Sequence, residues 1–190
     1  GRQANATGYR ATASGYMATA NGTNSLAVGV KANSAGTAST ALGSTANASG
    51  TAATAIGSQS ITRGNFSTAL GYQANATGNS AMALGRQANA AGYRATASGY
   101  MAAANGTNSL AIGVKANAAG TTSTAVGSNT LSSGTASTAL GSQASANSNF
   151  SIAIGYQANA SNTGALAIGR ESTASGYRSS SLGFQANAGY

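Results

Sequence analysis

The hexapeptide NSLAIG at residues 108–113 recurs as NSLAVG at residues 24–29, and its pattern decides how the chain folds. Its second and fourth residues, Ser and Ala, are small, whereas Leu110 and Ile112 are large and apolar. Successive side chains of an extended strand point to opposite faces. The small residues therefore share one face and the large ones share the other. This pattern predicts a strand with one very closely packed face and one apolar face that needs a partner.

Glycine keeps a strict spacing along the chain. It occupies every seventh position from Gly1 to Gly141, 21 times in succession, and 25 of the 27 glycines lie on this lattice. Only Ser148, Asn162 and Tyr190 depart from it. A disordered Gly-rich linker has no reason to keep such spacing, so the chain is a repeat protein. Frequent Gly with abundant Ser, Thr and Asn is unfavourable for helix, which argues against a coiled coil despite the seven-residue period.

Successive heptads alternate in type, so the true period is 14 residues. We call A halves the heptads that start at Gly1, Gly15 and every fourteenth residue onward, and B halves those that start at Gly8 and Gly22. The seventh residue is Val, Ile or Leu in 11 of 13 B halves and is never a large aliphatic residue in an A half. We predict that each 14-mer forms strand, turn, strand, turn, with Gly and the next two residues in each turn. About 13 such coils, stacked at roughly 4.8 Å, would give a rod on the order of 60 Å long.

The sequence also contains a repeat longer than the 14-residue period. Residues 1–44 match residues 85–128 at 38 of 44 positions. We interpret residues 1–190 as one domain with internal copies at 1–84, 85–168 and, in part, 169–190. Because the chain begins and ends within the pattern, we expect any stalk or membrane anchor to lie outside it.

The fourth and sixth residues of both halves are almost always Ala or Ser, and we expect them to face inward. An Ala methyl contributes well under about 1 kcal/mol, against roughly 1–2 kcal/mol per residue for backbone ordering. A lone roll should therefore be marginal, and the apolar stripe of the B halves implies a homo-oligomer. Symmetry alone does not choose between two and three copies. The A halves carry Asn or Thr instead, and that face should meet water.

The predicted interface residues are Leu26, Val28, Leu42, Ile56, Leu70, Met82, Leu84, Leu110, Ile112, Val126, Leu140, Ile152, Ile154, Leu166, Ile168 and Leu182.

Composition argues against catalysis and metal binding. His and Cys are absent and Glu171 is the single acid, so there is no general base and no carboxylate pair. The same lack of ligands leaves no metal site and no expected cofactor. The net charge is +8, but nine basic residues scattered at repeat spacing are a weak nucleic-acid signal, and we expect no nucleic-acid partner. No apolar run is long enough for a membrane span, and no secretory leader is present.

Basic and aromatic residues recur at fixed places in the repeat. The basic rows either attract anionic matrix or cell-surface polymers, or they keep the rod soluble or make contacts across the oligomer. The tyrosines that follow glycine either make adhesive contacts or cover the edge of the coil. Arg63 ends an A half, and we expect it to be exposed. The candidate ligand-binding residues are Asn24, Ser25, Asn108, Ser109, Tyr9, Arg10, Lys31, Tyr93, Arg94 and Lys115.

Repeats of the form NSLAIG-xxAxAxG resemble the head domain of YadA-type trimeric autotransporter adhesins of Gram-negative bacteria, over essentially the whole chain. The family's motif is NSVAIG, so Leu stands here for Val, and looser versions are FSTALG at 66–71, FSIAIG at 150–155 and GALAIG at 164–169. The resemblance implies an obligate trimer above a coiled-coil stalk and a β-barrel anchor. The expected fold is thus all-β, a left-handed parallel β-roll (solenoid) of 14-residue coils with two short strands per coil, assembled as a homotrimer.

The resemblance also implies a virulence-associated adhesin head that projects from the bacterial outer membrane. Its expected partners are extracellular matrix (collagen, fibronectin or laminin), host cells, other bacteria or abiotic surfaces. The family links collagen binding to NSVAIG repeats, which points here to 24–29 and 108–113. Two alternatives stay open: a trimeric structural spacer or phage-fibre segment without its own ligand, and an ice-binding solenoid. The ice-binding alternative fits less well, because the A halves present mostly Asn and scattered basic residues instead of ranks of Thr.

Overall fold

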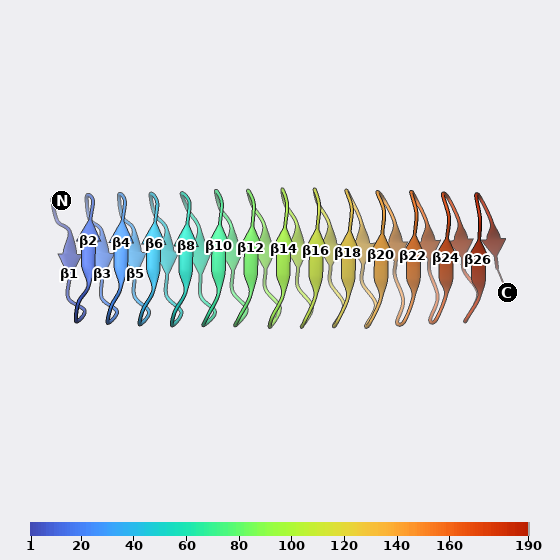
Figure 1. Cartoon of the computed structure of the whole chain (residues 1–190), viewed down its shortest axis with the longest axis horizontal. Coiled ribbons are helices and arrows are strands. Elements are labelled where there is room, and N and C mark those ends of the chain that lie inside the picture. The colour runs from blue at the N-terminus through green and yellow to red at the C-terminus, as the bar shows by residue number, and fades with distance from the viewer. Residues whose placement is uncertain (190) are drawn as a thin grey trace. The chain divides into compact units, whose positions relative to one another are not determined.

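The computed structural model describes residues 1–189, in which the regular structure consists of short β-strands joined by turns. The chain divides into two compact units, Gly1–Arg94 and Ala95–Tyr190. Within each unit, every coil contributes one strand to each of two parallel sheets, and the turns line two opposite edges (Figure 1). The odd-numbered strands come from A halves and form what we call the A sheet. The even-numbered strands come from B halves and form the B sheet.

In the first unit, neighbours in each sheet follow one another in coil order. Its A sheet consists of β1 (Asn5–Ala6), β3 (Thr19–Ala20), β5 (Asn33–Ser34), β7 (Asn47–Ala48), β9 (Ile61–Thr62), β11 (Asn75–Ala76) and β13 (Asn89–Ala90). Its B sheet consists of β2 (Thr12–Ser14), β4 (Leu26–Val28), β6 (Thr40–Leu42), β8 (Thr54–Ile56), β10 (Thr68–Leu70) and β12 (Met82–Leu84).

The second unit repeats this arrangement. Its A sheet consists of β15 (Ala103–Ala104), β17 (Asn117–Ala118), β19 (Leu131–Ser132), β21 (Ser145–Ala146), β23 (Asn159–Ala160), β25 (Thr173–Ala174) and β27 (Asn187–Ala188). Its B sheet consists of β14 (Thr96–Ser98), β16 (Leu110–Ile112), β18 (Thr124–Val126), β20 (Thr138–Leu140), β22 (Ile152–Ile154), β24 (Leu166–Ile168) and β26 (Ser180–Leu182).

The register places each residue beside the one 14 positions further on. In the B sheet, for example, Leu110 pairs with Thr124 and Ile112 pairs with Val126. All strand pairs given for the described residues are parallel, and equivalent positions of successive coils stack in rows. The predicted all-β parallel solenoid, with 14-residue coils and two strands per coil, is confirmed.

The core lies between the two sheets and contains only small side chains. Ala27 and Ala41 are fully buried, as are most other residues at the fourth and sixth positions of both halves. Some core serines bond to a partner inside the coil, as the Ser34 and Ser39 hydroxyls do at 2.6 Å, whereas the buried hydroxyls of Ser25, Ser109 and Ser123 have no hydrogen-bond partner. Thr62 is among the largest fully buried side chains. The prediction that these positions face inward is therefore correct.

The turns use glycine as predicted in the A halves, where Gly29 for example has a φ of 132°, but differently in the B halves. Most turns close with a backbone hydrogen bond back to their first residue, as from Ser25 N to the Gly22 carbonyl at 3.2 Å. In both kinds of turn the third residue, which is rarely glycine, is left-handed: Asn24 has a φ of 56°. Gly22 itself is not in the left-handed region, but a Cβ at this position would overlap the carbonyl of Gly36 in the next coil. Glycine is therefore required on the lattice for close stacking of the coils at least as much as for the backbone angles of the turns.

Two of the exceptions to the lattice show what happens without glycine. Ser148 bonds through its hydroxyl to the carbonyl of Ser161 at 2.8 Å, and Asn162 donates its side-chain amide to a carbonyl of the following coil at 3.1 Å. In the turn that starts at Asn162, glycine has moved two places to Gly164, which takes the left-handed position with a φ of 67°. Both replacing side chains thus bond to the neighbouring backbone that glycine would have packed against. Tyr190, the third exception, lies outside the described residues.

Candidate functional site

The outer face of the B sheet carries the predicted interface residues. In the second unit, Ile112, Val126 and Leu140 stack in register, and Leu110 lies in a second outward row, between Thr96 and Thr124. These side chains point away from the alanine core. Most of the predicted set are half-buried, while others such as Ile112, which is 40% exposed, are more open. Each unit therefore presents an uncovered aliphatic face, and its burial between copies of the chain stays a prediction.

This apolar face is interrupted at one coil in each unit. In β2 the outward residues are Thr12 and Ser14, and in β14 they are Thr96 and Ser98. The two strands lie 84 residues apart in sequence, so the long repeat places a polar coil at the same point of each copy.

The outer face of the A sheet is polar, as predicted. Asn33 donates its side-chain amide to the side-chain oxygen of Asn47 at 3.3 Å, and Asn75 does the same to Asn89 at 3.0 Å. Stacked amides in register bond to one another along the sheet. This face therefore satisfies part of its own hydrogen bonding within one chain.

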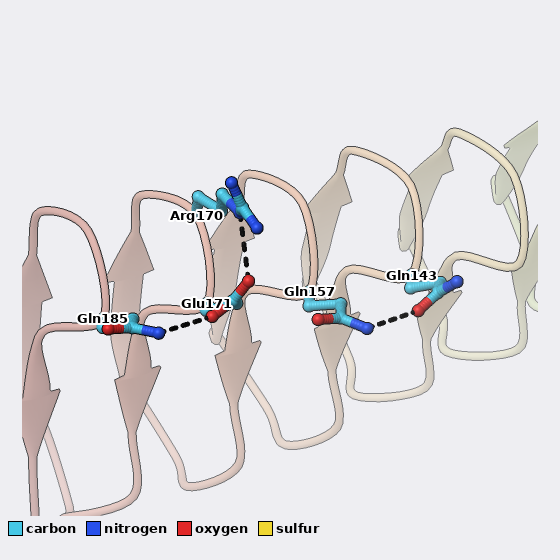
Figure 2. Close-up of polar contacts among 5 residues, drawn as sticks. All are labelled: Gln143, Gln157, Arg170, Glu171 and Gln185. Carbon is cyan, nitrogen blue, oxygen red and sulfur yellow. Dashed lines mark hydrogen bonds and ion pairs between the residues drawn. The ribbon is translucent and has the colours of Figure 1, made fainter.

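The A turns, which precede the A strands, carry a second set of ladders (Figure 2). Gln157 donates to Gln143 at 2.8 Å, and Gln185 donates to Glu171 at 2.8 Å. Arg170 donates to the other carboxylate oxygen of Glu171 at 3.0 Å. The hydrogen bond from Gln185, followed by the bond and charge of Arg170, lowers the pKa of Glu171. Glu171, the one acid of the chain, therefore accepts hydrogen bonds at the A-turn edge.

Arginine and aromatic rings stack between coils on the same edge. The guanidinium of Arg170 lies over Tyr156 at 5.8 Å and over Phe184 at 5.5 Å, and that of Arg86 lies over Tyr72 at 5.8 Å. Sequence reasoning missed these stacks and the Gln ladders. The available signal was the 14-residue spacing itself, because equivalent turn positions in successive coils are neighbours.

The B turns, which precede the B strands, hold three Tyr-Arg pairs of another kind. In each, the arginine lies over the ring of the tyrosine just before it: Arg10 over Tyr9 at 5.2 Å, Arg94 over Tyr93 at 5.3 Å, and Arg178 over Tyr177 at 5.1 Å. All six side chains are exposed. The pairs are therefore local to one turn and open to solvent.

The candidate ligand-binding residues do not form one cluster. Asn24 lies on the B turn next to Tyr9 and bonds through its backbone N–H to the Tyr9 carbonyl at 2.7 Å. Lys31 and Lys115 are exposed on A turns, at the opposite edge of their coils. Asn108 is exposed on a B turn of the second unit.

Two members of that set need correction. Ser25 and Ser109 are each only 2% exposed, because the fourth residue of a half faces the core. Their hydroxyls cannot reach a ligand at the surface. The exposed residue of each motif is instead its first, Asn24 or Asn108.

Other features of the described residues delimit the site. Arg63 is exposed, as predicted. Across residues 1–189 no three His, Cys, Asp or Glu side chains come together, and the surface forms no pocket. The candidate sites are thus the open sheet faces and turn edges. None of the described residues belongs to a helix long and apolar enough to cross a membrane.

Comparison with known proteins identifies relatives of this architecture. The family described as YadA head domain repeat (2 copies) matches residues 6–32, 20–46, 34–60, 48–74, 63–88, 76–102, 104–130, 132–158 and 160–186. Among solved structures, the chain is similar to the collagen-binding domain of the Yersinia adhesin YadA. The two share 26% identity with a TM-score of 0.53, over 73% of this chain and 70% of that one. No curated protein sequence matches the chain.

Proposed function

Because the chain belongs to the family of YadA head domain repeats, we propose that it is the head of a bacterial surface adhesin. The observation that carries this proposal is the match of family repeats along most of the chain, together with the likeness to a collagen-binding adhesin domain. The open faces and edges suit extended or flat partners. The head has no catalytic role, and it projects outward from a membrane anchor that belongs to another part of the protein.

We further propose that the head is a homotrimer whose B sheets face one another. The support is the uncovered aliphatic face of each unit, opposite an A sheet whose amides bond among themselves. A large exposed apolar surface on a soluble protein marks an interface. Burial of these side chains would add the apolar area that the alanine core lacks.

Collagen is the first ligand to test, because the similar Yersinia domain binds it. The test is solid-phase binding of the purified chain to immobilised collagen, fibronectin, laminin and bare polystyrene, with oligomer mass and circular dichroism recorded on the same samples. The proposal predicts saturable binding to at least one matrix protein or surface. A folded, assembled chain that binds none of them would favour the structural spacer instead.

The NSLAxG motifs offer a sharper version of this test. Asn24→Ala with Asn108→Ala changes exposed turn residues and should leave the fold intact. Replacement of Leu110 by Asp instead alters the proposed interface. If only the Leu110 variant loses collagen binding, and loses assembly with it, the motif acts through folding, whereas loss in the Asn variant alone marks a direct contact.

A further inference from the structure

We propose that the B-turn edge binds a linear anionic polysaccharide through its Tyr-Arg pairs, Tyr9–Arg10, Tyr93–Arg94 and Tyr177–Arg178. The inference rests on the proposed adhesin function and names a ligand class for it, distinct from matrix proteins. The chemistry recognised is a sugar ring that bears sulfate or carboxylate groups.

The geometry of the pair suits such a ligand. Each arginine occupies the left-handed third position of its turn, with φ values of 53° to 55° across the three pairs, and lies over the preceding ring. Guanidinium groups bind sulfate and carboxylate through two parallel hydrogen bonds. The exposed ring offers an apolar surface against a sugar ring, and Tyr9 and Tyr177 are 67% and 61% exposed. One turn thus supplies both the charge and the stacking surface.

The charged residues of the B turns are all arginines. The single acid, Glu171, lies on an A turn, on the opposite edge of its coil, where it bonds Arg170. The first unit contains six basic residues and no acid. An anionic chain approaching the B turns of this unit meets no carboxylate that would compete for Arg10 or Arg94.

Spacing favours a long ligand over a short one. Tyr9–Arg10 and Tyr93–Arg94 both lie in the first unit, six coils apart, which corresponds to roughly 29 Å along the stacked strands. A polymer that spans this distance can occupy both pairs, and the second contact then forms at high effective concentration. A monosaccharide cannot, so affinity should rise with ligand length.

The A turns provide a matched set of arginines, whose removal is expected to have little effect on polysaccharide binding. Arg2, Arg86 and Arg170 recur at the same 84-residue spacing. Arg86 and Arg170 lie over rings of neighbouring coils, and Arg170 also binds Glu171. Removing either triplet changes the net charge equally. General attraction between a basic protein and a polyanion would therefore weaken to a similar extent in both variants, whereas a site at the B turns would be lost in one of them.

The experiment compares two triple variants in binding to immobilised heparin, with hyaluronate as a carboxylate-only polymer and duplex DNA as an unrelated polyanion. The B-turn variant is Arg10→Gln, Arg94→Gln and Arg178→Gln. Gln is native at the same left-handed turn position in Gln3 and Gln59, with φ of 58° and 60°, so this backbone accepts it. The A-turn control is Arg2→Gln, Arg86→Gln and Arg170→Gln.

We expect the B-turn variant to lose roughly tenfold or more in heparin affinity, as for the loss of charge-assisted bidentate bonds, and the A-turn variant to lose about threefold or less. A Lys triplet at the B turns keeps the charge and should bind with intermediate affinity, because the bidentate fork is lost. Heparin fragments shorter than the span between pairs should bind more weakly. Relative binding of hyaluronate shows whether carboxylate alone suffices.

Equal losses in both triplets, or DNA binding with the same pattern, would overturn the proposal and leave only general attraction between a basic protein and polyanions. Absence of heparin binding by the wild-type chain would overturn it too. Because collagen binding is measured separately, failure here leaves the adhesin proposal standing, and unchanged circular dichroism with unchanged oligomer mass shows that the variants fold.

Discussion

The A and B sheets of each unit share one alanine and serine core but differ on their outer faces. The A strands are two residues long and turn a row of Asn outward, and several of these amides bond to the next coil. The B strands are three residues long and turn two rows outward, one rich in Leu, Ile and Val and the other composed mainly of Thr and large apolar residues. A polar row can satisfy itself along the stack, whereas an aliphatic row leaves water only against another apolar surface. We therefore infer that the A face meets solvent and that the B face packs against a second protein chain.

The largest expected effect comes from charging the aliphatic face. Leu110→Asp with Ile112→Asp should dissociate or unfold the oligomer, because unpaired buried carboxylates cost several kcal/mol each. The matched control is Ala119→Asp with Asn147→Asp, two exposed positions on the A face of the same unit, which should stay assembled. Light scattering and circular dichroism measure both variants. A wild-type oligomer in the first variant would show that the B face is not an interface.

A smaller but still large effect is expected from the glycine lattice. Gly36→Ala places a Cβ against the carbonyl of Gly50 in the next coil, and should lower the free energy of unfolding by about 3 kcal/mol or more. Gly164→Ala is the control, since its added Cβ approaches no backbone carbonyl and its closest neighbour is the side-chain Cγ of Arg178 at 3.2 Å. That change should cost about 1 kcal/mol, for its left-handed backbone. Denaturant unfolding measures both, and equal losses would contradict a stacking role for the lattice.

Replacing the polar outward residues of β14 by apolar ones should increase the stability of the assembled chain. Thr96→Leu with Ser98→Ile would make both outward positions of β14 apolar and should stabilise the assembled chain by about 2 kcal/mol per copy. Thr173→Leu on the A face is the control and should give no such gain. Thermal unfolding at fixed protein concentration gives the comparison. An unchanged or lower unfolding temperature in the double variant would mean that the B face at this coil is not buried.

The smallest effect concerns Glu171 on the A turn. Its pKa is lowered in the folded chain, chiefly by Gln185. Its stabilising contribution is therefore complete above the ordinary Glu pKa of about 4.3 and is lost as the pH falls through the lower, folded value. Stability should decline slightly across this acid range. Glu171→Gln should flatten the decline, and a variant that titrates like the wild type would refute the assignment.

Much of the fold could be predicted because the same pattern of small residues, large residues and glycine recurs in each coil. Alternation in NSLAIG assigned Ala111 to the core and Leu110 to the surface, and the 14-residue period gave the coils and sheets. The role of glycine was only partly predicted, because close packing against the next coil cannot be distinguished from turn geometry in a sequence. The stack of Arg170 between two rings was missed, since it joins residues of three different coils. Ser109 was assigned to a ligand by its motif, although alternation already placed it inside.

The most direct test of the central claim is the mass of the wild-type chain in solution, measured by sedimentation equilibrium over a range of concentrations together with circular dichroism. The account predicts a β-structured species of three chains that shows little folded monomer on dilution. A stable, fully folded single chain, with Leu110 and Ile112 left in water, would contradict it.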